Sequence, residues 1–255
     1  MMKYRKSWLP SGDRKETVLD METTSADIIR MRAEYARRAQ KHDEAYKYSM
    51  FNPAALFAYQ QRQVWILKIL GEYGFYPLSS ANILEVGCGS GGVLTEFLRY
   101  GVDPAKLHGI EVIGPSVQSA RSNLPHLPLI FGDGQTMPFP DGSFQLVMQY
   151  TALSSVLDAN VRKNIAREMV RVLDPEKGLI LSYDFWINLV NRQTHGITPN
   201  EMRELFPNCT LKFHRITLAP PITRRLIKLS RMLCAVLENL TIFNSHHLVA
   251  ITPNR

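Results

Sequence analysis

The stretch ILEVGCGSGG, residues 83–92, decides the fold. Apolar, strand-forming residues run directly into a cluster of glycines, a pattern typical of a buried strand that turns sharply into a helix. Three of the glycines, Gly87, Gly89 and Gly92, match the dinucleotide-binding pattern G-x-G-x-x-G. Glu111 follows near the spacing at which that pattern places an acidic residue for a ribose. On this evidence alone the loop could hold NAD.

The same stretch also fits a second pattern, E-x-G-x-G-x-G, through Glu85, Gly87, Gly89 and Gly91. A pyrophosphate needs bare backbone amides at a helix N-terminus, whereas an amino acid portion with an ammonium group also needs an acid nearby. Glu85 supplies that acid, which favours a cofactor with an amino acid portion over NAD. NADP is disfavoured further, because the charge of Glu111 would repel a 2′-phosphate.

Short apolar runs recur along the middle of the chain, and helical patterns separate most of them. The runs lie at 82–86, 107–112, 128–132, 144–150 and 178–184, and the helical patterns at about 91–100, 115–123 and 160–173. Runs that are apolar throughout fit parallel strands buried on both faces, and their alternation with helices implies right-handed crossovers. We therefore predict an α/β fold with a doubly wound, mostly parallel sheet.

The pattern changes after the fifth of these runs. A short helix is predicted at about 199–205, followed by strands at about 210–218 and 247–252. A helical segment, and not a simple crossover, joins these two strands. We therefore predict an antiparallel last strand at one edge of the sheet.

Length and composition fit one large domain of 255 residues, 45% apolar and 21% charged. Residues 1–24 are predicted to be a flexible tail, and helices are predicted at about 25–40 and 54–73. No run is long enough for a membrane span, and the start lacks the apolar segment of a secretory signal. These features predict a cytoplasmic protein.

The distribution of charge and the spacing of the cysteines limit the kinds of site that can be expected. The formal net charge is +7, and the part from Arg192 onward holds nine Lys or Arg against three Glu, so that +6 of it lies in the last quarter. Cys88, Cys209 and Cys234 are odd in number and have no C-x-x-C spacing, which argues against a disulfide framework and a zinc site. We predict no metal.

The glycine loop and three further blocks resemble the class I S-adenosylmethionine-dependent methyltransferases, specifically the broad small-molecule "type 11" group. The blocks are GIEV (109–112), FGDGQTMPFPDGSFQLV (131–147) and REMVRVLDPEKGLILSYD (167–184), in the family's order and spacing. The resemblance covers roughly residues 80–185. It implies a Rossmann-like, seven-stranded methyltransferase domain over 79–255, with S-adenosyl-L-methionine as methyl donor and S-adenosyl-L-homocysteine as product.

Carried over by position, the resemblance assigns cofactor contacts. It implies that Glu111 accepts both ribose hydroxyls, that Asp133 with the Gly134 backbone faces the adenine amino edge, and that Gln149 and Tyr150 line the methyl-donor side. The predicted cofactor-binding residues are Glu85, Gly87, Gly89, Glu111, Val112, Asp133, Gly134, Gln149, Tyr150 and Tyr48.

The segment 25–78 is expected to be a helical lid, because such segments often fold over the cofactor in this family. Tyr46 and Tyr48 would then form an aromatic wall near the sulfonium, where cation–π attraction is favourable. Ordinary packing of these tyrosines on the core is the alternative. Lid segments sometimes exchange between subunits, so a homo-oligomer is a further option.

The acceptor is expected beyond the carboxyl ends of the strands, where open α/β sheets bind ligands. The candidate catalytic residues are Tyr183 and Asp184, after the fifth strand, and His195 in the loop that follows, as a general base. A solvated loop histidine is the alternative for His195. The methyl group is already activated on the donor, so in-line displacement needs mainly proximity and orientation, and a base is optional for an amine.

The segment 219–240, between the last two strands, has the pattern of a basic amphipathic helix. Arg224, Lys228 and Arg231 fall on one face, and the opposite face is formed by Leu226, Leu229, Leu233, Leu237 and Leu240. Such a helical insertion could bury its apolar face on the sheet. It could instead lie over the acceptor site or touch a membrane surface, which would suit an amphiphilic acceptor.

The resulting hypothesis is methyl transfer to a small-molecule hydroxyl or amine, on a natural product of secondary metabolism or on a sugar. One alternative is an RNA methyltransferase, but Tyr183-Asp184-Phe185-Trp186 replaces the Asn/Asp-Pro-Pro-Tyr of enzymes that methylate exocyclic base nitrogens. No nucleic acid partner is therefore predicted. The other alternative is a noncatalytic protein that binds S-adenosylmethionine, and the intact Glu85, Glu111 and Asp133 argue against it.

Overall fold

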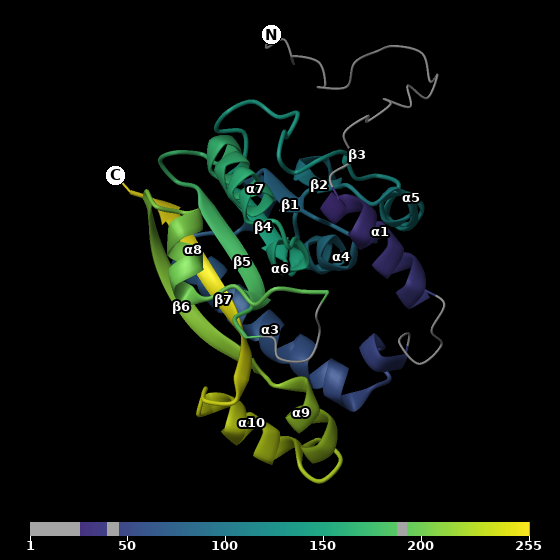
Figure 1. Cartoon of the computed structure of the whole chain (residues 1–255). Helices are drawn as coiled ribbons and strands as arrows, with labels where there is room; N and C mark the ends of the chain where they lie inside the picture. Colours follow the sequence, from purple (N-terminus) through teal and green to yellow (C-terminus); the bar gives the residue numbers. More distant parts are fainter. Residues whose placement is uncertain (1–25, 40–45, 188–192, 255) are drawn as a thin grey trace.

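The computed structural model describes residues 26–39, 46–187 and 193–254, so the predicted tail lies outside the described residues. These residues form a seven-stranded sheet flanked by helices (Figure 1). The strands are β1 (Ile83–Val86), β2 (Leu107–Glu111), β3 (Leu129–Phe131), β4 (Leu146–Tyr150), β5 (Leu179–Phe185), β6 (Cys209–Leu218) and β7 (Asn244–Pro253). Their order in the sheet is β3-β2-β1-β4-β5-β7-β6.

The strand pairing confirms the predicted doubly wound sheet. Strands β1 to β5 are parallel, and β7 runs antiparallel between β5 and β6. Every residue of β1 and β4 is buried, as expected for central parallel strands covered on both faces. β1 lies at the centre, with Glu85 in register with Gly109 on β2 and Met148 on β4. The chain order reverses at β1 and β4, which places the ligand crevice at their carboxyl ends.

Helices cover the two faces of the sheet with separate hydrophobic cores. One face packs against α3 (Pro53–Glu72), α4 (Gly92–Arg99) and α5 (Gly114–Asn123). The other face packs against α1 (Ala26–Ala39), α6 (Ala152–Ser155), α7 (Ala159–Val172) and α8 (Pro199–Leu205). Both predicted N-terminal helices are therefore present, but they lie on opposite faces of the sheet.

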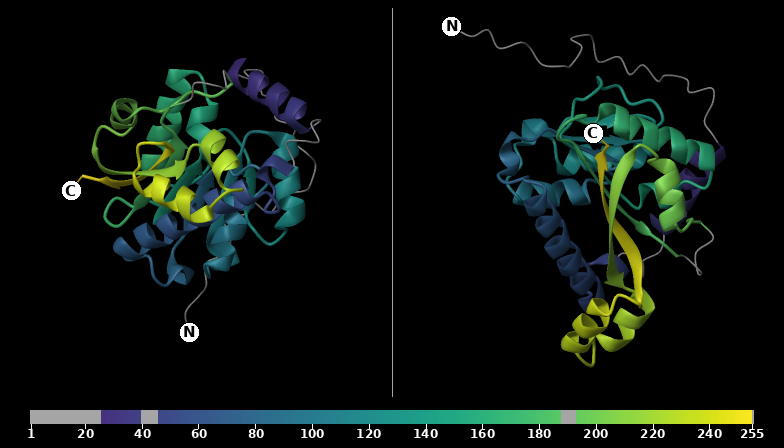
Figure 2. Two further views of the ribbon diagram at one scale, coloured as in Figure 1. Left: turned by 90° about the horizontal axis from the view of Figure 1, so that it is seen from below. Right: turned by 90° about the vertical axis from the view of Figure 1, so that its left-hand side faces the viewer.

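The C-terminal segment differs from its prediction. The expected continuous helix over 219–240 is two helices, α9 (Pro220–Leu226) and α10 (Arg231–Asn239). The break follows from a new N-cap, because the Ser230 hydroxyl accepts a hydrogen bond from the Leu233 N–H at 3.2 Å. The α9–α10 hairpin projects beyond the end of the sheet, beside one end of α3 (Figure 2). Among the described helices, none is long and apolar enough to cross a membrane.

Candidate functional site

A cavity opens at the carboxyl ends of β1, β2 and β4, where the topology predicts a ligand. Six of the predicted cofactor-binding residues line it: Gly87, Glu111, Val112, Asp133, Gly134 and Tyr150. Four others, Glu85, Gly89, Gln149 and Tyr48, do not line it. The cavity is long, since its walls run from Gly132 beyond β3 to Thr151 beyond β4.

The glycine loop between β1 and α4 has a conformation that few other residues could adopt. Gly87, Gly89 and Gly91 all have positive φ angles, of 73°, 53° and 85°. A side chain at Gly87 would also place its Cβ 2.7 Å from the Cβ of Ala152. The loop therefore brings bare backbone to the cavity at the N-terminus of α4, as a cofactor loop requires.

Glu111, at the end of β2, fixes this loop. Its Oε2 accepts a hydrogen bond from the Gly89 N–H at 2.8 Å, and its Oε1 accepts one from the Ile113 N–H at 2.8 Å. Each carboxylate oxygen has a second lone pair, so the same group can still accept two ligand hydroxyls. Burial raises the pKa of Glu111, although the backbone donors oppose this shift.

Asp133 lies in the loop after β3, at the other end of the cavity. Its carboxylate accepts bonds from the Gln135 N–H at 2.8 Å and from the Gln135 side-chain amide at 3.0 Å. A Cβ at Gly134 would approach the side chains of Val86 and Ile165 at 3.3 and 3.4 Å. The backbone there can thus lie close to a flat ligand group between apolar side chains.

Helix α1 closes one side of the cavity with Asp27, Ile28, Met31 and Tyr35. The Asp27 carboxylate accepts bonds from the backbone N–H groups of Leu157 and Asp158, both at 2.7 Å. This contact holds α1 against the N-terminus of α7. Within the segment 25–78, which the resemblance assigns to a lid, α1 is thus a part that lines the cavity, and its role as a lid stays a prediction.

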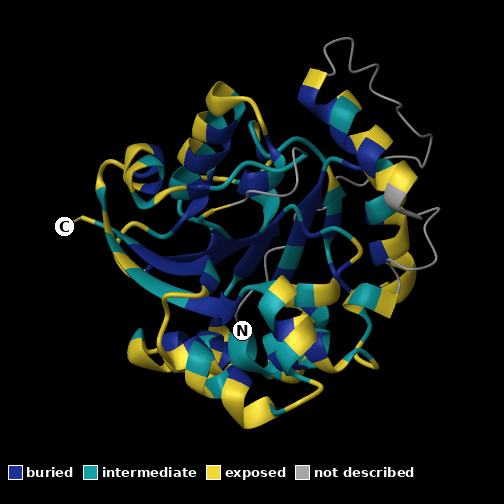
Figure 3. Ribbon diagram, turned by 60° about the horizontal axis from the view of Figure 1, so that its bottom comes forward, coloured by how far each residue is buried: buried dark blue, intermediate teal, exposed yellow. Residues whose placement is uncertain are grey.

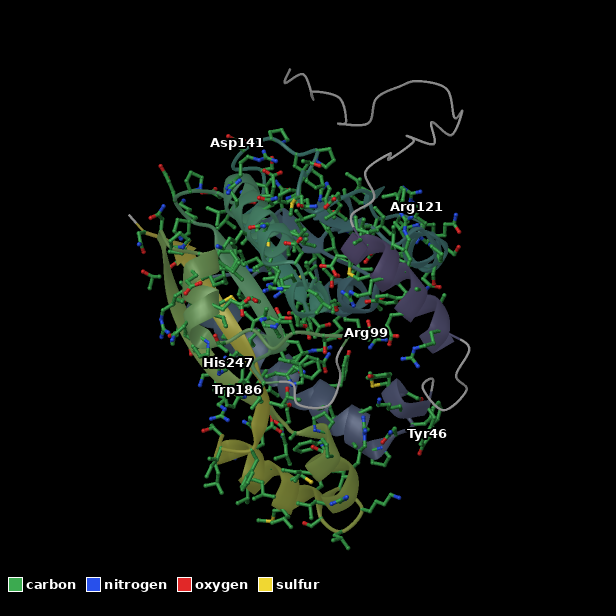
Figure 4. The ribbon with its side chains drawn as sticks, viewed as in Figure 1. Tyr46, Arg99, Arg121, Asp141, Trp186 and His247 are labelled. Atoms are coloured by element: carbon green, nitrogen blue, oxygen red, sulfur yellow. The ribbon has the colours of Figure 1, made fainter. Side chains whose placement is uncertain are left out.

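The structure does not bring the predicted aromatic wall to the cavity. Tyr48 is 65% exposed and Tyr46 is 59% exposed. Figure 4 shows Tyr46 at the edge of the molecule, whereas Trp186, just after β5, stacks on His247 of β7. The Tyr48 ring contacts Lys47, whose Nζ lies 5.3 Å from the ring centroid. The local sequence cannot show which face of a short segment turns outward.

Gln149 and Asp184 form a buried hydrogen-bond network beneath α6. The Gln149 side-chain amide donates to the Asp184 carboxylate, and its carbonyl accepts from the Ala152 N–H at 3.0 Å. The other Asp184 oxygen accepts from the Ser154 N–H at 3.0 Å. Burial raises the pKa of Asp184 to about 6. These contacts orient the turn after β4, and they point away from Tyr150 and Tyr183 across the sheet.

Tyr150 and Tyr183 belong to a second group of side chains, which we call the Arg62 cluster: Arg62, Glu85, Glu96, Tyr150, Tyr183 and His246. The Arg62 guanidinium lies 5.5 Å from the ring centroids of both tyrosines and contacts Glu96 at 2.5 Å. His246 stacks on Tyr183 with 4.7 Å between ring centroids. Arg62, Glu96 and His246 are candidate residues that the sequence analysis did not single out.

Several polar atoms of the Arg62 cluster are buried without a partner. Among the described side chains these include Arg62 Nε, Glu85 Oε2, Glu96 Oε2 and the Tyr150 hydroxyl. Such atoms are costly to bury unpaired and mark a place where a polar ligand group fits. Burial, together with the charges of Glu96 and Glu111, raises the pKa of Glu85 well above its usual range.

Arg62 is the cation that contacts Glu96 within the cluster, and Arg99 also acts to lower the pKa of Glu96, against the effect of burial. Burial alone would lower the pKa of Arg62, but attraction to Glu96 and hydrogen bonding raise it overall. Burial raises the pKa of both tyrosines, so each remains a neutral phenol. The Tyr183 hydroxyl is held by Thr217 Oγ1 at 2.8 Å.

The His195 backbone N–H donates to the Ser154 carbonyl at 2.7 Å, but its side chain contacts a different set of partners. Its Nε2 is 2.8 Å from Glu201, which also pairs with Arg162 at 2.8 Å. Its side chain is 43% exposed, and it does not line the cavity. These contacts fit a surface ion-pair network better than a base that faces the acceptor. Among the described residues no three His, Cys, Asp or Glu side chains gather as a metal site.

The buried His246 makes stability depend on pH. Burial lowers its pKa from 6.5 to about 3. The unfolded chain therefore binds an extra proton as the pH falls below 6.5, so stability is complete above that value and is lost toward the folded pKa. At about pH 5 the contribution of His246 to this loss is about 2 kcal/mol relative to neutral pH, and His247, whose pKa burial lowers to about 4, adds to the loss over the same range.

Urea unfolding at both pH values would measure this loss. His246→Phe should keep the stacking on Tyr183 and remove most of the His246 contribution, whereas His126→Gln, at an exposed position, should leave the pH dependence unchanged. An equal loss in wild type and His246→Phe would contradict the assignment.

Comparison with known proteins identifies the domain that contains the cavity. A family model described as a methyltransferase domain matches residues 83–176. Phthiotriol/phenolphthiotriol dimycocerosates methyltransferase 1 from Mycobacterium ulcerans is 36% identical over 100 residues, which are 38% of this chain and 35% of that protein. The tRNA N(3)-cytidine methyltransferase METTL2 from Gallus gallus is 25% identical over 175 residues, 57% of this chain and 47% of that protein.

Among solved structures, geranyl diphosphate C-methyltransferase from Streptomyces coelicolor A3(2) superposes with a TM-score of 0.62 and 12% identity. The match covers 91% of this chain and 99% of that one. This likeness shows the fold. The chain spans about a third of the length of the first of these relatives, and the matched part centres on the cofactor half of the sheet.

The sheet order, the glycine loop and the acid at the end of β2 define a Rossmann-like protein that binds an adenosyl cofactor. Residues 83–176 form a methyltransferase domain of the class I S-adenosylmethionine-dependent type, and S-adenosylmethionine is the cofactor that this domain implies.

Proposed function

We propose that the protein transfers the methyl group of S-adenosylmethionine to a hydroxyl or amine of a small molecule, such as a natural product or a sugar. The observation that carries this proposal is the position of Tyr150. Tyr150 lines the cofactor cavity, and its ring packs against Tyr183 and Arg62, with ring-centroid distances of 5.8 and 5.5 Å. The cluster at the ends of β4 and β5 is thus next to the methyl-donor end of the cavity.

The cofactor would be held by residues at both ends of the cavity. Glu111 would accept the ribose hydroxyls, and Asp133 with Gly134 would face the adenine. Beside the other end, in the Arg62 cluster and outside the cavity lining, the unpaired oxygen of Glu85 and the unpaired Nε of Arg62 suit the ammonium and the carboxylate of the amino acid portion. When bound, S-adenosylmethionine supplies a methyl group already activated on a sulfonium.

The chain's own residues then have two tasks. Helix α1 excludes water, because Asp27 ties it over the cavity. Tyr150 and Tyr183 orient the acceptor through hydroxyls that stay protonated, and Thr217 fixes the direction of the Tyr183 hydroxyl. Proximity and orientation supply most of the rate, with no step that requires His195 or Asp184.

Tyr183→Phe tests the acceptor part of the proposal. It should lower kcat/KM about tenfold, the effect of one lost hydrogen bond, and leave the affinity for S-adenosylhomocysteine unchanged. The assay follows labelled methyl transfer from S-adenosylmethionine to hydroxyl, amine and sugar acceptors. Tyr76→Phe, at a 90% exposed tyrosine, is the matched control.

The same assay distinguishes the alternatives. A tRNA methyltransferase is among the relatives, so an RNA acceptor belongs in the panel. Label that reaches RNA alone would replace the small-molecule proposal. Tight binding of S-adenosylhomocysteine without transfer to any acceptor would favour a noncatalytic binding protein.

A further inference from the structure

The outer face of α10 is apolar, although it faces solvent. Leu229, Met232, Leu233, Val236 and Leu240 recur at helical spacing and are 79%, 78%, 41%, 49% and 54% exposed. Ile242 and Phe243, just after the helix, extend this set. In Figure 3 the exposed positions gather on the outer side of the projecting helices. We call these seven residues the α10 apolar face.

The face of α10 that packs against the protein carries a buried glutamate, Glu238. Cys234 is fully buried, and Glu238 is 5% exposed and accepts a hydrogen bond from the Thr217 N–H at 3.0 Å. Ala235 and Leu237 pack inward beside these two residues, so the inner face of α10 is already occupied by its own set of side chains. The apolar face is not left over from packing on the sheet, because other residues of the helix do that packing.

The exposed charged residues of the hairpin beside the α10 apolar face are all basic. Arg224, Arg225, Lys228 and Arg231 are all exposed, and the acid within 219–243, Glu238, is buried. The hairpin thus presents four cations beside a contiguous apolar surface. A second copy of the chain would bring four like charges against these four in a two-fold contact, which disfavours a dimer through this face.

We propose that the α9–α10 hairpin docks the protein on an anionic membrane surface. The apolar face would enter the interface between headgroups and acyl chains, and the four basic residues would contact the anionic headgroups. This docking does not depend on the proposed methyl transfer and can be measured without cofactor or acceptor.

The hairpin also lies beside the Arg62 cluster. Glu238 on α10 holds Thr217, and Thr217 holds the Tyr183 hydroxyl, so two hydrogen bonds join the docking helix to the cluster. Arg231 reaches Gln60 on α3, two residues before Arg62. If the proposed function holds, an amphiphilic acceptor could pass from the bilayer to the site over a short path.

Vesicle cosedimentation tests the docking with the full chain. The protein should bind vesicles made of equal parts phosphatidylcholine and phosphatidylglycerol, and should bind phosphatidylcholine vesicles much more weakly. Arg224→Glu with Arg225→Glu should lower the affinity at least about 30-fold, from two lost cations alone. Raised salt should weaken wild-type binding, because it screens the headgroup attraction.

Matched variants separate docking from folding. Leu229→Ser with Met232→Ser changes two well-exposed side chains and should abolish most binding without changing the melting temperature. Lys163→Glu with Arg167→Glu makes the same charge change on exposed positions of α7, at the opposite end of the molecule, and should leave binding intact (Figure 1).

Three outcomes would overturn the proposal. The wild type could fail to bind anionic vesicles, or the α7 charge variant could lose as much binding as the hairpin variant. Sedimentation equilibrium could also show a dimer that Leu229→Ser with Met232→Ser converts to a monomer, which would assign the face to a second copy.

Discussion

Replacing Glu111 by alanine is expected to weaken the binding of S-adenosylhomocysteine at least about 100-fold. Two effects add. The ribose loses a charged acceptor for both of its hydroxyls, at roughly 1.5 to 3 kcal/mol for each hydrogen bond. The Gly89 N–H also loses its partner at 2.8 Å, so the glycine loop is no longer tied to β2.

Calorimetric titration of the purified chain would measure this loss. Glu176→Ala removes an exposed glutamate from a turn and should leave the affinity unchanged. Glu111→Gln keeps the volume but turns an amide N–H₂ toward one of the two backbone donors, so it should also bind weakly. Wild-type affinity in Glu111→Ala would remove this residue from the site. Heat from NAD and none from S-adenosylhomocysteine would return the loop to the dinucleotide pattern.

The fold could be predicted closely because its signals are local. Five continuous apolar runs became β1 to β5, within a residue or two at most of their ends, since central parallel strands need apolar residues on both faces. The positions of Gly87 and Glu111 could be predicted for the same reason. Each lies where a predicted strand ends, and the carboxyl ends of the strands line the cavity. The number of strands, seven, came from the family resemblance, and the antiparallel last strand from the altered C-terminal pattern, whereas the order of the strands came from the structure alone.

The Arg62 cluster could not be predicted because its burial is not local. In the sequence Arg62 stands among glutamines on a helix, where a charged residue normally marks a solvated face. Its burial arises from the packing of α3 over the ends of β4 and β5, which brings it to Tyr150 and Tyr183. The break in 219–240 was readable in principle, since Ser230 is a good N-cap, but the leucine spacing favoured one continuous helix.

The second large effect is expected at Arg62. Arg62→Leu should lower the free energy of unfolding by about 3 to 5 kcal/mol, because it leaves a buried carboxylate without its cation. Glu96 is 6% exposed and contacts Arg62 at 2.5 Å, and the buried Glu85 lies in the same cluster. Lys68→Leu, at an exposed lysine on the same helix, is the matched control and should change stability little.

The double variant Arg62→Leu with Glu96→Leu separates stability from function. Removing both charges replaces a buried ion pair by apolar side chains, which is often neutral for stability, so unfolding in urea should return close to wild type. Cofactor affinity and methyl transfer should stay low, because no guanidinium remains beside Glu85 and Tyr150. Recovery of both properties in the double variant would show that Arg62 only balances the charge of Glu96. Stability that stays as low as in Arg62→Leu would show that packing, and not the ion pair, explains the loss.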